Sequence, residues 1–203
     1  MLKEETELML KKIEEGEIGK PKMLLHACCA PCTTGVLYQL TNYFDVTILY
    51  YNPNIYPKEE YDLRYENLIQ LSKLLNFKII EFGYDEQKYL SLIKGYEDNK
   101  EGGERCHICY KFRLEETAKY AQTHNFDIFT TTLSVSPYKN ALVLNNQGNE
   151  LESKYNVKYF YSDFKKHDGY KNSIKFSKEY GLYRQDYCGC RFSLNDKNNR
   201  TNK

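Results

Sequence analysis

Seven cysteines form three groups in this 203-residue chain, and they are the residues best suited to chemistry. The groups are Cys28-Cys29-Cys32, Cys106-Cys109 and Cys188-Cys190. Thiolate sulfur is a soft ligand for zinc and for iron-sulfur clusters, and paired thiols exchange electrons by forming and breaking a disulfide. In a chain with an odd number of cysteines and no secretion signal, such groups favour metal binding or redox chemistry over structural cross-links.

The first two groups have the spacing of a shared metal site. Cys29-x-x-Cys32 and Cys106-x-x-Cys109 would suit a structural zinc ion, and spacing alone does not separate zinc from an iron-sulfur cluster. Cys28 adds a fifth thiol, although a closed zinc site needs only four ligands. This surplus favours redox work over a purely structural metal.

The third group is predicted to be a redox pair. Gly189 separates Cys188 from Cys190 and supplies the backbone freedom that a disulfide between residues i and i+2 requires. Such a small ring is strained, and strained disulfides are reduced easily. We expect this pair to cycle between a dithiol and a disulfide.

Other polar residues have two interpretations each. His26 could donate a proton, but a structural hydrogen bond is the preferred explanation, and His107 is expected to point away from the cysteines beside it. Lys165 and Arg184 are candidate contacts to phosphate or substrate, and Tyr138 could stack on an exposed base. A solvated surface or ordinary packing explains these last three residues equally well.

Strand-like and helix-like segments alternate along the chain, and these elements must position the cysteines. Alternation of this kind predicts a single three-layer α/β domain with a mostly parallel, Rossmann-like sheet of about five strands. Functional loops are then expected at the carboxyl ends of the strands, where Cys28 and Cys29 fall. The predicted strands are 22–27, 45–51, 77–82, 127–133 and 158–164, and the predicted helices are 33–43, 58–76, 85–93, 106–125, 137–155 and 170–180.

The chain is predicted to contain a peripheral N-terminal helix (1–20), one catalytic domain (21–193) and a disordered tail (194–203). Its net charge of +1 argues against a general nucleic-acid coat but allows a local basic footprint. No stretch reaches the roughly 20 apolar residues that a membrane span needs, and the first residues lack the apolar core of a signal peptide. We therefore expect a cytoplasmic protein without membrane contact.

Five motifs resemble those of the QueH family of epoxyqueuosine reductases, in the order in which that family carries them. They are LLHACCAPC, YNPNIYPKEEY, EGGERCHICYKFRL, FTTTLSVSPYK and LYRQDYCGCRFS, and the similarity runs from about Met23 to Ser193. The resemblance implies an oxidoreductase that reduces the epoxide of epoxyqueuosine, at the wobble position of tRNA, to queuosine. This reduction is the last step of tRNA queuosine biosynthesis.

The resemblance also implies roles for individual cysteines. It implies a [4Fe-4S] cluster bound by Cys28, Cys29, Cys106 and Cys109, a possible additional mononuclear iron, and a redox-active catalytic pair, Cys188 and Cys190. Cys32 is left without a role. The implied partners are tRNA carrying epoxyqueuosine and an unidentified electron donor.

Two alternatives belong to other functional classes. A zinc-containing, nucleotide-dependent tRNA-modifying enzyme would have a similar fold, but the cysteine run stands where its Ser-Gly-Gly-x-Asp-Ser signature would follow the first strand. A non-enzymatic zinc module that binds RNA is the second alternative. Colour separates the possibilities, because an iron-sulfur protein purified without oxygen is brown and a zinc protein is colourless.

Overall fold

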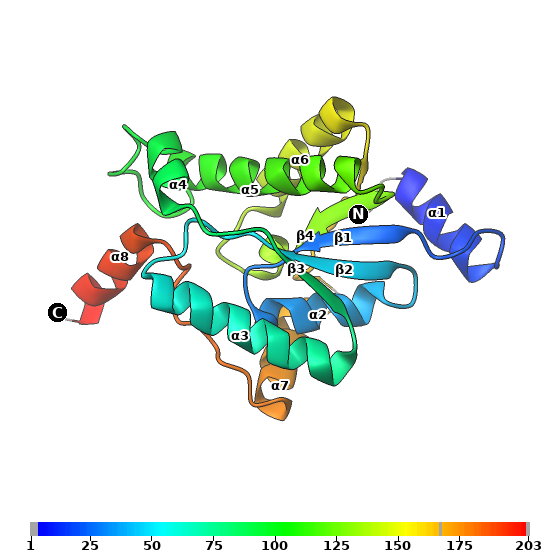
Figure 1. Cartoon of the computed structure of the whole chain (residues 1–203), viewed down its shortest axis with the longest axis horizontal. Helices are drawn as coiled ribbons and strands as arrows, with labels where there is room; N and C mark the ends of the chain where they lie inside the picture. The colour runs from blue at the N-terminus through cyan, green and yellow to red at the C-terminus, as the bar shows by residue number, and fades with distance from the viewer. Residues whose placement is uncertain (1–3, 167, 202–203) are drawn as a thin grey trace.

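A computed structural model describes residues 4–166 and 168–201, and it confirms the predicted fold class. In the part described, five parallel strands form one sheet in the order β3-β2-β1-β4-β5, with helices on both faces (Figure 1). The elements are α1 (Glu4–Glu14), β1 (Lys22–His26), α2 (Ala30–Leu40), β2 (Asp45–Tyr50), α3 (Lys58–Leu75), β3 (Lys78–Glu81), α4 (Glu86–Leu92), α5 (Glu104–Thr123), β4 (Ile128–Thr131), the 3-10 helix η1 (Thr132–Val135), α6 (Ala141–Tyr155), β5 (Lys158–Tyr159), α7 (Gly169–Glu179) and α8 (Arg191–Thr201).

Successive residues of the central strand β1 face opposite helical layers. Met23 and Leu25 pack in one buried cluster, whereas Leu24 between them packs in the other, and all three are fully buried. Side chains alternate in this way along any strand, and a strand buried on both faces is therefore apolar over most of its length. The short apolar run of β1 is thus explained by its place at the centre of the sheet.

The two helical layers are α2, α3 and α7 on one face and α5 and α6 on the other (Figure 1). α2 and α7 approach very closely at Gly35, where an added Cβ would lie 2.4 Å from the carbonyl oxygen of Gly169. Glycine at this position lets α7 pack against the helix that begins beside the first cysteines. Among the described residues, no helix combines the length and the apolar character needed to cross a membrane.

The fifth strand is shorter than the predicted range 158–164. β5 ends at Tyr159, and the backbone of Ser162 is bound instead by the side chain of Asn145 on α6. Asn145 Nδ2 donates to Ser162 O at 3.0 Å, and Ser162 N donates to Asn145 Oδ1 at 3.1 Å. A side chain thus replaces the hydrogen bonds that a longer strand would have made.

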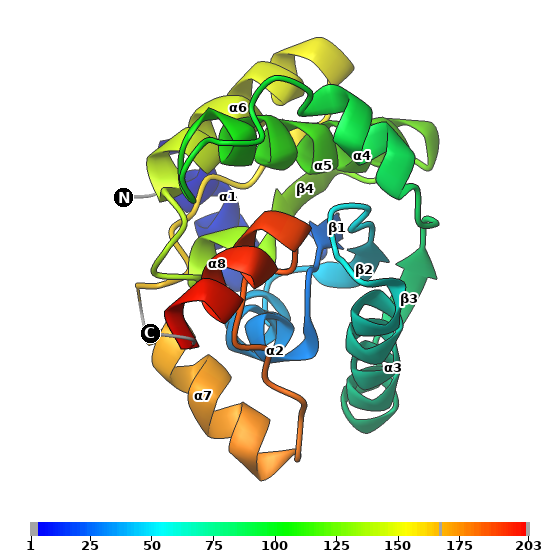
Figure 2. The same cartoon turned by 90° about the vertical axis from the view of Figure 1, so that its left-hand side faces the viewer.

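The segment predicted as a disordered tail, 194–203, is helical as far as Thr201, while Asn202 and Lys203 lie outside the described residues. Tertiary contacts hold this segment in its helical conformation, and amino-acid composition does not reveal them. Arg191 pairs with Glu86 at 2.5 Å, and Lys197 pairs with Asp186 at 2.6 Å. Figures 1 and 2 place the resulting α8 at the carboxyl end of the sheet, where functional loops gather in this fold class.

Candidate metal centre

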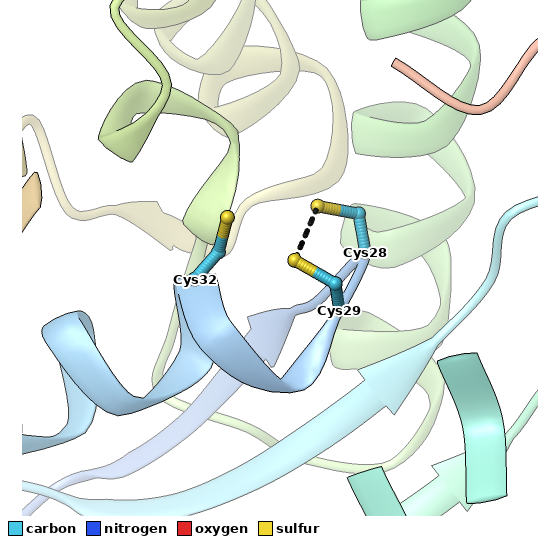
Figure 3. A group of neighbouring side chains, drawn as sticks. All are labelled: Cys28, Cys29 and Cys32. Atoms are coloured by element: carbon cyan, nitrogen blue, oxygen red, sulfur yellow. Dashed lines mark hydrogen bonds between the residues drawn. The ribbon is translucent and has the colours of Figure 1, made fainter. Parts of the chain in front are cut away.

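The first cysteine group lies where β1 ends and α2 begins. Cys28 and Cys29 follow the strand, and Cys32 lies in the first turn of α2. Pro31 suits that turn, because the backbone N–H that proline lacks would have no partner there. The ligand atoms of Cys28, Cys29 and Cys32 all lie within 4.8 Å of one another, and Figure 3 shows the three side chains gathered together. This loop can present three sulfurs to one metal.

The three thiols of this group influence one another strongly. Hydrogen bonds with Cys29 and Cys32 hold the pKa of Cys28 well below its ordinary value. Burial raises the pKa of Cys29 to about 12, and hydrogen bonds with the other two sulfurs raise the pKa of Cys32. Of the three thiols, Cys28 is therefore the one whose thiolate the surroundings favour. A bound cation would draw off the remaining protons, since thiolates are the form that binds metal.

The second cysteine group lies at the start of α5. Cys106 and Cys109 are both buried, and the backbone N–H of Gly102 donates to the Cys106 sulfur at 3.3 Å. Burial raises the pKa of both thiols, that of Cys109 to about 12, and the neighbouring thiols of Cys188 and Cys190 raise both further. The α5 pair and the C-terminal pair therefore lie close enough to interact.

The third group occupies the loop before α8. Cys190 is buried with its sulfur 3.4 Å from the hydroxyl of Ser193, whereas Cys188 is half-buried and lines a cavity. All seven cysteines are free thiols in the structure. A disulfide between Cys188 and Cys190 therefore stays a prediction for the oxidised state.

Helix α3 holds this C-terminal loop in place. The buried Arg64 donates to the carbonyl oxygens of Cys188 at 3.2 Å and Tyr187 at 3.4 Å, and it pairs with Glu60 at 2.7 Å. Gly189 has a φ of +122°, and a Cβ there would lie 2.9 Å from Arg64 Nη1. Glycine therefore fits this loop for reasons of both conformation and packing.

A buried guanidinium lies among the thiols of all three groups. Burial lowers the pKa of Arg113, but the thiols of Cys109, Cys188 and Cys28 raise this pKa above its ordinary value. Arg113 Nη1 donates to Asn52 Oδ1 at 3.3 Å, but Nη2 is buried and has no hydrogen-bond partner among the described residues. An unpaired cationic nitrogen amid thiols fits an anionic, sulfur-rich group held by these cysteines.

Gln185 also contacts the first cysteine group, and the sequence analysis missed it. Its Nε2 donates to the Cys29 sulfur at 2.9 Å, from 156 positions away in the sequence. Hydrogen bonds to metal-bound sulfur tune the potential of a cluster, so this contact bears on redox chemistry. Gln185 lies in the motif LYRQDYCGCRFS, but its residue type and spacing do not mark it, because only the fold brings it to Cys29.

His26 has a structural role, as the sequence analysis preferred. Its Nδ1 lies 2.9 Å from Thr131 Oγ1, and its Nε2 lies 3.0 Å from Tyr51 O. Burial lowers the pKa of His26 to about 4, so the imidazole is neutral at physiological pH. It ties β1 to β4 and to the end of β2.

A cavity of about 570 Å³ opens beside the cysteines. Cys28 and Cys32 of the first group and Cys188 of the third line the same space, so a bound molecule would meet both. Tyr138, with 79% of its surface exposed, and Arg184 also line it, and their contact with a substrate stays a prediction.

The predicted ligand set is not gathered as tightly as the first group. Within residues 4–166 and 168–201, Cys28, Cys29 and Cys32 are the one set of three with ligand atoms this close, and Cys106 and Cys109 lie outside it. Cys32, which had no predicted role, is thus part of the closest group. The buried cysteines of all three groups nevertheless belong to one continuous cluster of packed side chains.

The family model for the epoxyqueuosine reductase QueH matches residues 23–196, most of the chain. The chain belongs to the QueH family. It is 40% identical over 185 residues to a QueH epoxyqueuosine reductase of Streptococcus pyogenes, covering 88% of this chain and 72% of that relative. It is 43% identical over 182 residues to the QueH of Staphylococcus epidermidis, covering 86% and 76%. Family membership confirms the resemblance of the five sequence motifs.

A solved structure is similar at a lower level. The U34-tRNA thiolase NcsA from Methanococcus maripaludis, determined with its [4Fe-4S] cluster, matches with a TM-score of 0.49 and 12% identity, over 98% of this chain and 72% of that one. A similarity of this size carries no argument about the QueH site described above.

Proposed function

We propose that this protein reduces the epoxide of epoxyqueuosine in tRNA to give queuosine, the last step of queuosine biosynthesis. Membership of the QueH family over residues 23–196 supports this function, and the observation that carries it is the placement of Cys28, Cys32 and Cys188 around one cavity. A substrate in that cavity meets a metal-binding loop and a candidate redox pair together. A purely structural zinc site would need neither arrangement.

We infer that the metal group is a [4Fe-4S] cluster bound by Cys28, Cys29, Cys106 and Cys109. The buried thiols, their soft sulfur and the unpaired Nη2 of Arg113 all fit such an anionic cluster. When bound, the cluster supplies electrons one at a time. The additional mononuclear iron implied by the resemblance has no ligands assigned among these residues.

The reaction consumes two electrons and two protons, and the epoxide oxygen leaves as water. We propose that Cys188 and Cys190 provide these equivalents, because oxidation of two thiols to one disulfide releases two electrons and two protons. Arg64 holds the carbonyl oxygen of Cys188, and Tyr56 N donates to Gly189 O at 2.8 Å, so the pair stays at the cavity. An electron donor, still to be identified, then returns the disulfide to the dithiol.

The experiment that tests this function is preparation of the protein without oxygen, followed by metal and sulfide analysis. We expect about four irons with matching sulfide, and conversion of tRNA-bound epoxyqueuosine to queuosine by mass spectrometry of the nucleosides. Stoichiometric zinc without sulfide, and no conversion, would contradict the proposal and favour the zinc alternatives.

Serine variants test the ligand assignment in the same preparation. Serine at Cys28, Cys29, Cys106 or Cys109 should remove most of the iron and sulfide, because serine replaces a soft thiolate with a hard oxygen. Cys32→Ser is the matched control and should keep most of the cluster. Loss of the cluster in Cys32→Ser with retention in Cys29→Ser would show that Cys32 is the ligand in place of Cys29.

A further inference from the structure

One lysine lines the cavity beside the cysteines. Lys139 follows η1 and precedes α6, and its half-buried side chain shares the cavity with Cys28, Cys32 and Cys188. It is one residue from the exposed Tyr138. A positive charge therefore lies where a substrate would meet both the metal-binding loop and the candidate redox pair.

The backbone at Lys139 is held by several hydrogen bonds. Lys165 Nζ donates to Lys139 O at 3.3 Å and to Ser134 O at 3.0 Å, and Lys139 N donates to Ser136 O at 3.2 Å. The next residue, Asn140, caps α6 by accepting from Leu142 N at 2.9 Å. Lys165 thus fixes the loop that carries Lys139, and its suggested contact with a substrate stays a prediction.

Within residues 4–166 and 168–201, no ion pair neutralises the Lys139 ammonium. Among the described residues, no carboxylate lies within 4.0 Å of its Nζ and no hydrogen bond leaves it, although Glu101 and Asp186 also line the cavity. An ammonium keeps its proton at neutral pH, because the ordinary pKa of lysine is about 10.4. The group therefore stays cationic, with donors available to a ligand.

We propose that Lys139 is a catalytic residue whose ammonium donates a hydrogen bond to the epoxide oxygen and stabilises the negative charge that develops there. This inference rests on the proposed function and deepens it. Fixed donors aimed at a developing oxyanion contribute strongly to catalysis because the site is already organised before the reaction. Lys139 lines the same cavity as Cys28 and Cys188, so we assign its contact to the part of the substrate that is reduced.

The role proposed for Lys139 does not change the number of electrons and protons that the reaction consumes. Two electrons from the reductant of the proposed activity and two protons convert the epoxide to an alkene, two C–O bonds break, and the oxygen leaves as water. Lys139 stabilises the oxygen while the first C–O bond breaks and its electron pair stays on oxygen. It ends the cycle with the same protons that it began with.

Phosphate binding is the competing role for this lysine, and two other cations are better placed for it. Arg184 and Arg200 are exposed and line the same cavity. Phosphates remain hydrated and lie along the surface of a nucleic acid, whereas the ring that is reduced must reach the cysteines. The half-buried Lys139 matches the second requirement.

The test compares Lys139→Met, Lys139→Arg and the control Lys171→Met, whose lysine is exposed and outside the cavity. Iron, sulfide and the visible spectrum establish that the metal site is intact in each. In single turnover without oxygen, Lys139→Met should convert epoxyqueuosine tRNA about 100 to 1,000 times more slowly than wild type, as loss of one oxyanion donor does elsewhere. Lys139→Arg should recover part of the rate, and Lys171→Met should match wild type.

Binding measurements separate contact with the oxygen from contact with phosphate. Lys139→Met should weaken binding of tRNA bearing epoxyqueuosine by about tenfold or more, and leave binding of tRNA bearing queuosine unchanged, because the product lacks that oxygen. Equal weakening of both, with a shallower salt dependence, would overturn the proposal in favour of phosphate binding. Loss of iron from Lys139→Met and Lys139→Arg alike would overturn it in favour of a structural role.

The same data separate failure of the proposed function from failure of the Lys139 assignment. If wild-type protein with a full cluster did not convert epoxyqueuosine tRNA, the reductase assignment would fall. The Lys139 assignment would then be judged by the two binding measurements, and it would fall as well if wild type bound both tRNAs equally.

Discussion

Cys188 and Cys190 have different surroundings although one residue separates them. Cys188 is half-buried and faces the cavity, whereas Cys190 is buried, and burial raises the pKa of its thiol. A thiol at the cavity is placed to react first, and a buried thiol beside it is placed to close the disulfide. This division of roles is a proposal about single residues, and single substitutions test it.

Serine at Cys188 or at Cys190 should leave the iron and sulfide content unchanged and should lower conversion of epoxyqueuosine tRNA by roughly 100-fold or more. The reason is that neither variant can release two electrons through a disulfide. Cluster content is measured by iron and sulfide analysis, and conversion by mass spectrometry of the nucleosides. Binding of the modified tRNA should persist in both.

Thiol labelling checks the same pair independently of turnover. Oxidised wild type should show two fewer reactive thiols than reduced protein, and peptide mapping should find Cys188 joined to Cys190. Normal turnover in either variant, or loss of the cluster whenever one of the two is changed, would point to a spectator or ligand role.

At the scale of elements, the contact between α3 and the loop before α8 decides where the redox pair lies. Gly189→Ala should disturb this contact, because alanine is strained at a φ of +122° and its Cβ would meet the Arg64 guanidinium. We expect a loss of about 1–3 kcal/mol of stability and lower turnover with the cluster retained. Thermal unfolding and turnover measure the two effects.

Gly19→Ala is the matched control for this substitution. A Cβ at Gly19 would have no heavy atom within 4 Å, and its backbone is outside the left-handed region, so stability and turnover should both stay near wild type. Equal behaviour of the Gly189 and Gly19 variants would show that the α3 contact does not position the pair.

An element can be predicted from the sequence when the residues that determine it lie within the element itself. The apolar or β-branched runs of β1 and β2 predicted strands, because burial on both faces leaves a direct mark on composition. The end of β5 could not be predicted, since the side chain of Asn145 determines it from another element. The helix at 191–201 was missed for the same reason, as its ion pairs involve Glu86 and Asp186.

The residues of the candidate site also differ in whether the sequence alone could reveal them. Cysteines are recognisable by residue type and spacing, so the three groups could be found in the sequence. Arg64, Lys139 and Gln185 meet the cysteines or their cavity only in the folded chain, although Lys139 and Gln185 belong to two of the five motifs found in the sequence. Their residue types are common on any protein surface, so residue type and spacing alone could not select them.

At the scale of the whole molecule, the net charge of +1 limits how the protein binds tRNA. With Arg184 and Arg200 at the cavity, we expect about two phosphate contacts. The logarithm of affinity should then fall with the logarithm of salt concentration with a slope no steeper than about −2, since each contact to a single strand contributes about −0.7. Titrations at several salt concentrations measure this slope. A slope steeper than about −5 would instead reveal an extended basic surface.

The closeness of the Cys28, Cys29 and Cys32 sulfurs has a practical consequence for preparation and storage. Metal-free protein kept in air will join two of these sulfurs or oxidise one to a sulfenic acid, because a thiolate lies beside two further thiols. Such material cannot take up metal until a reductant restores the thiols. Colourless protein from an aerobic purification would therefore report its exposure to air rather than its native metal.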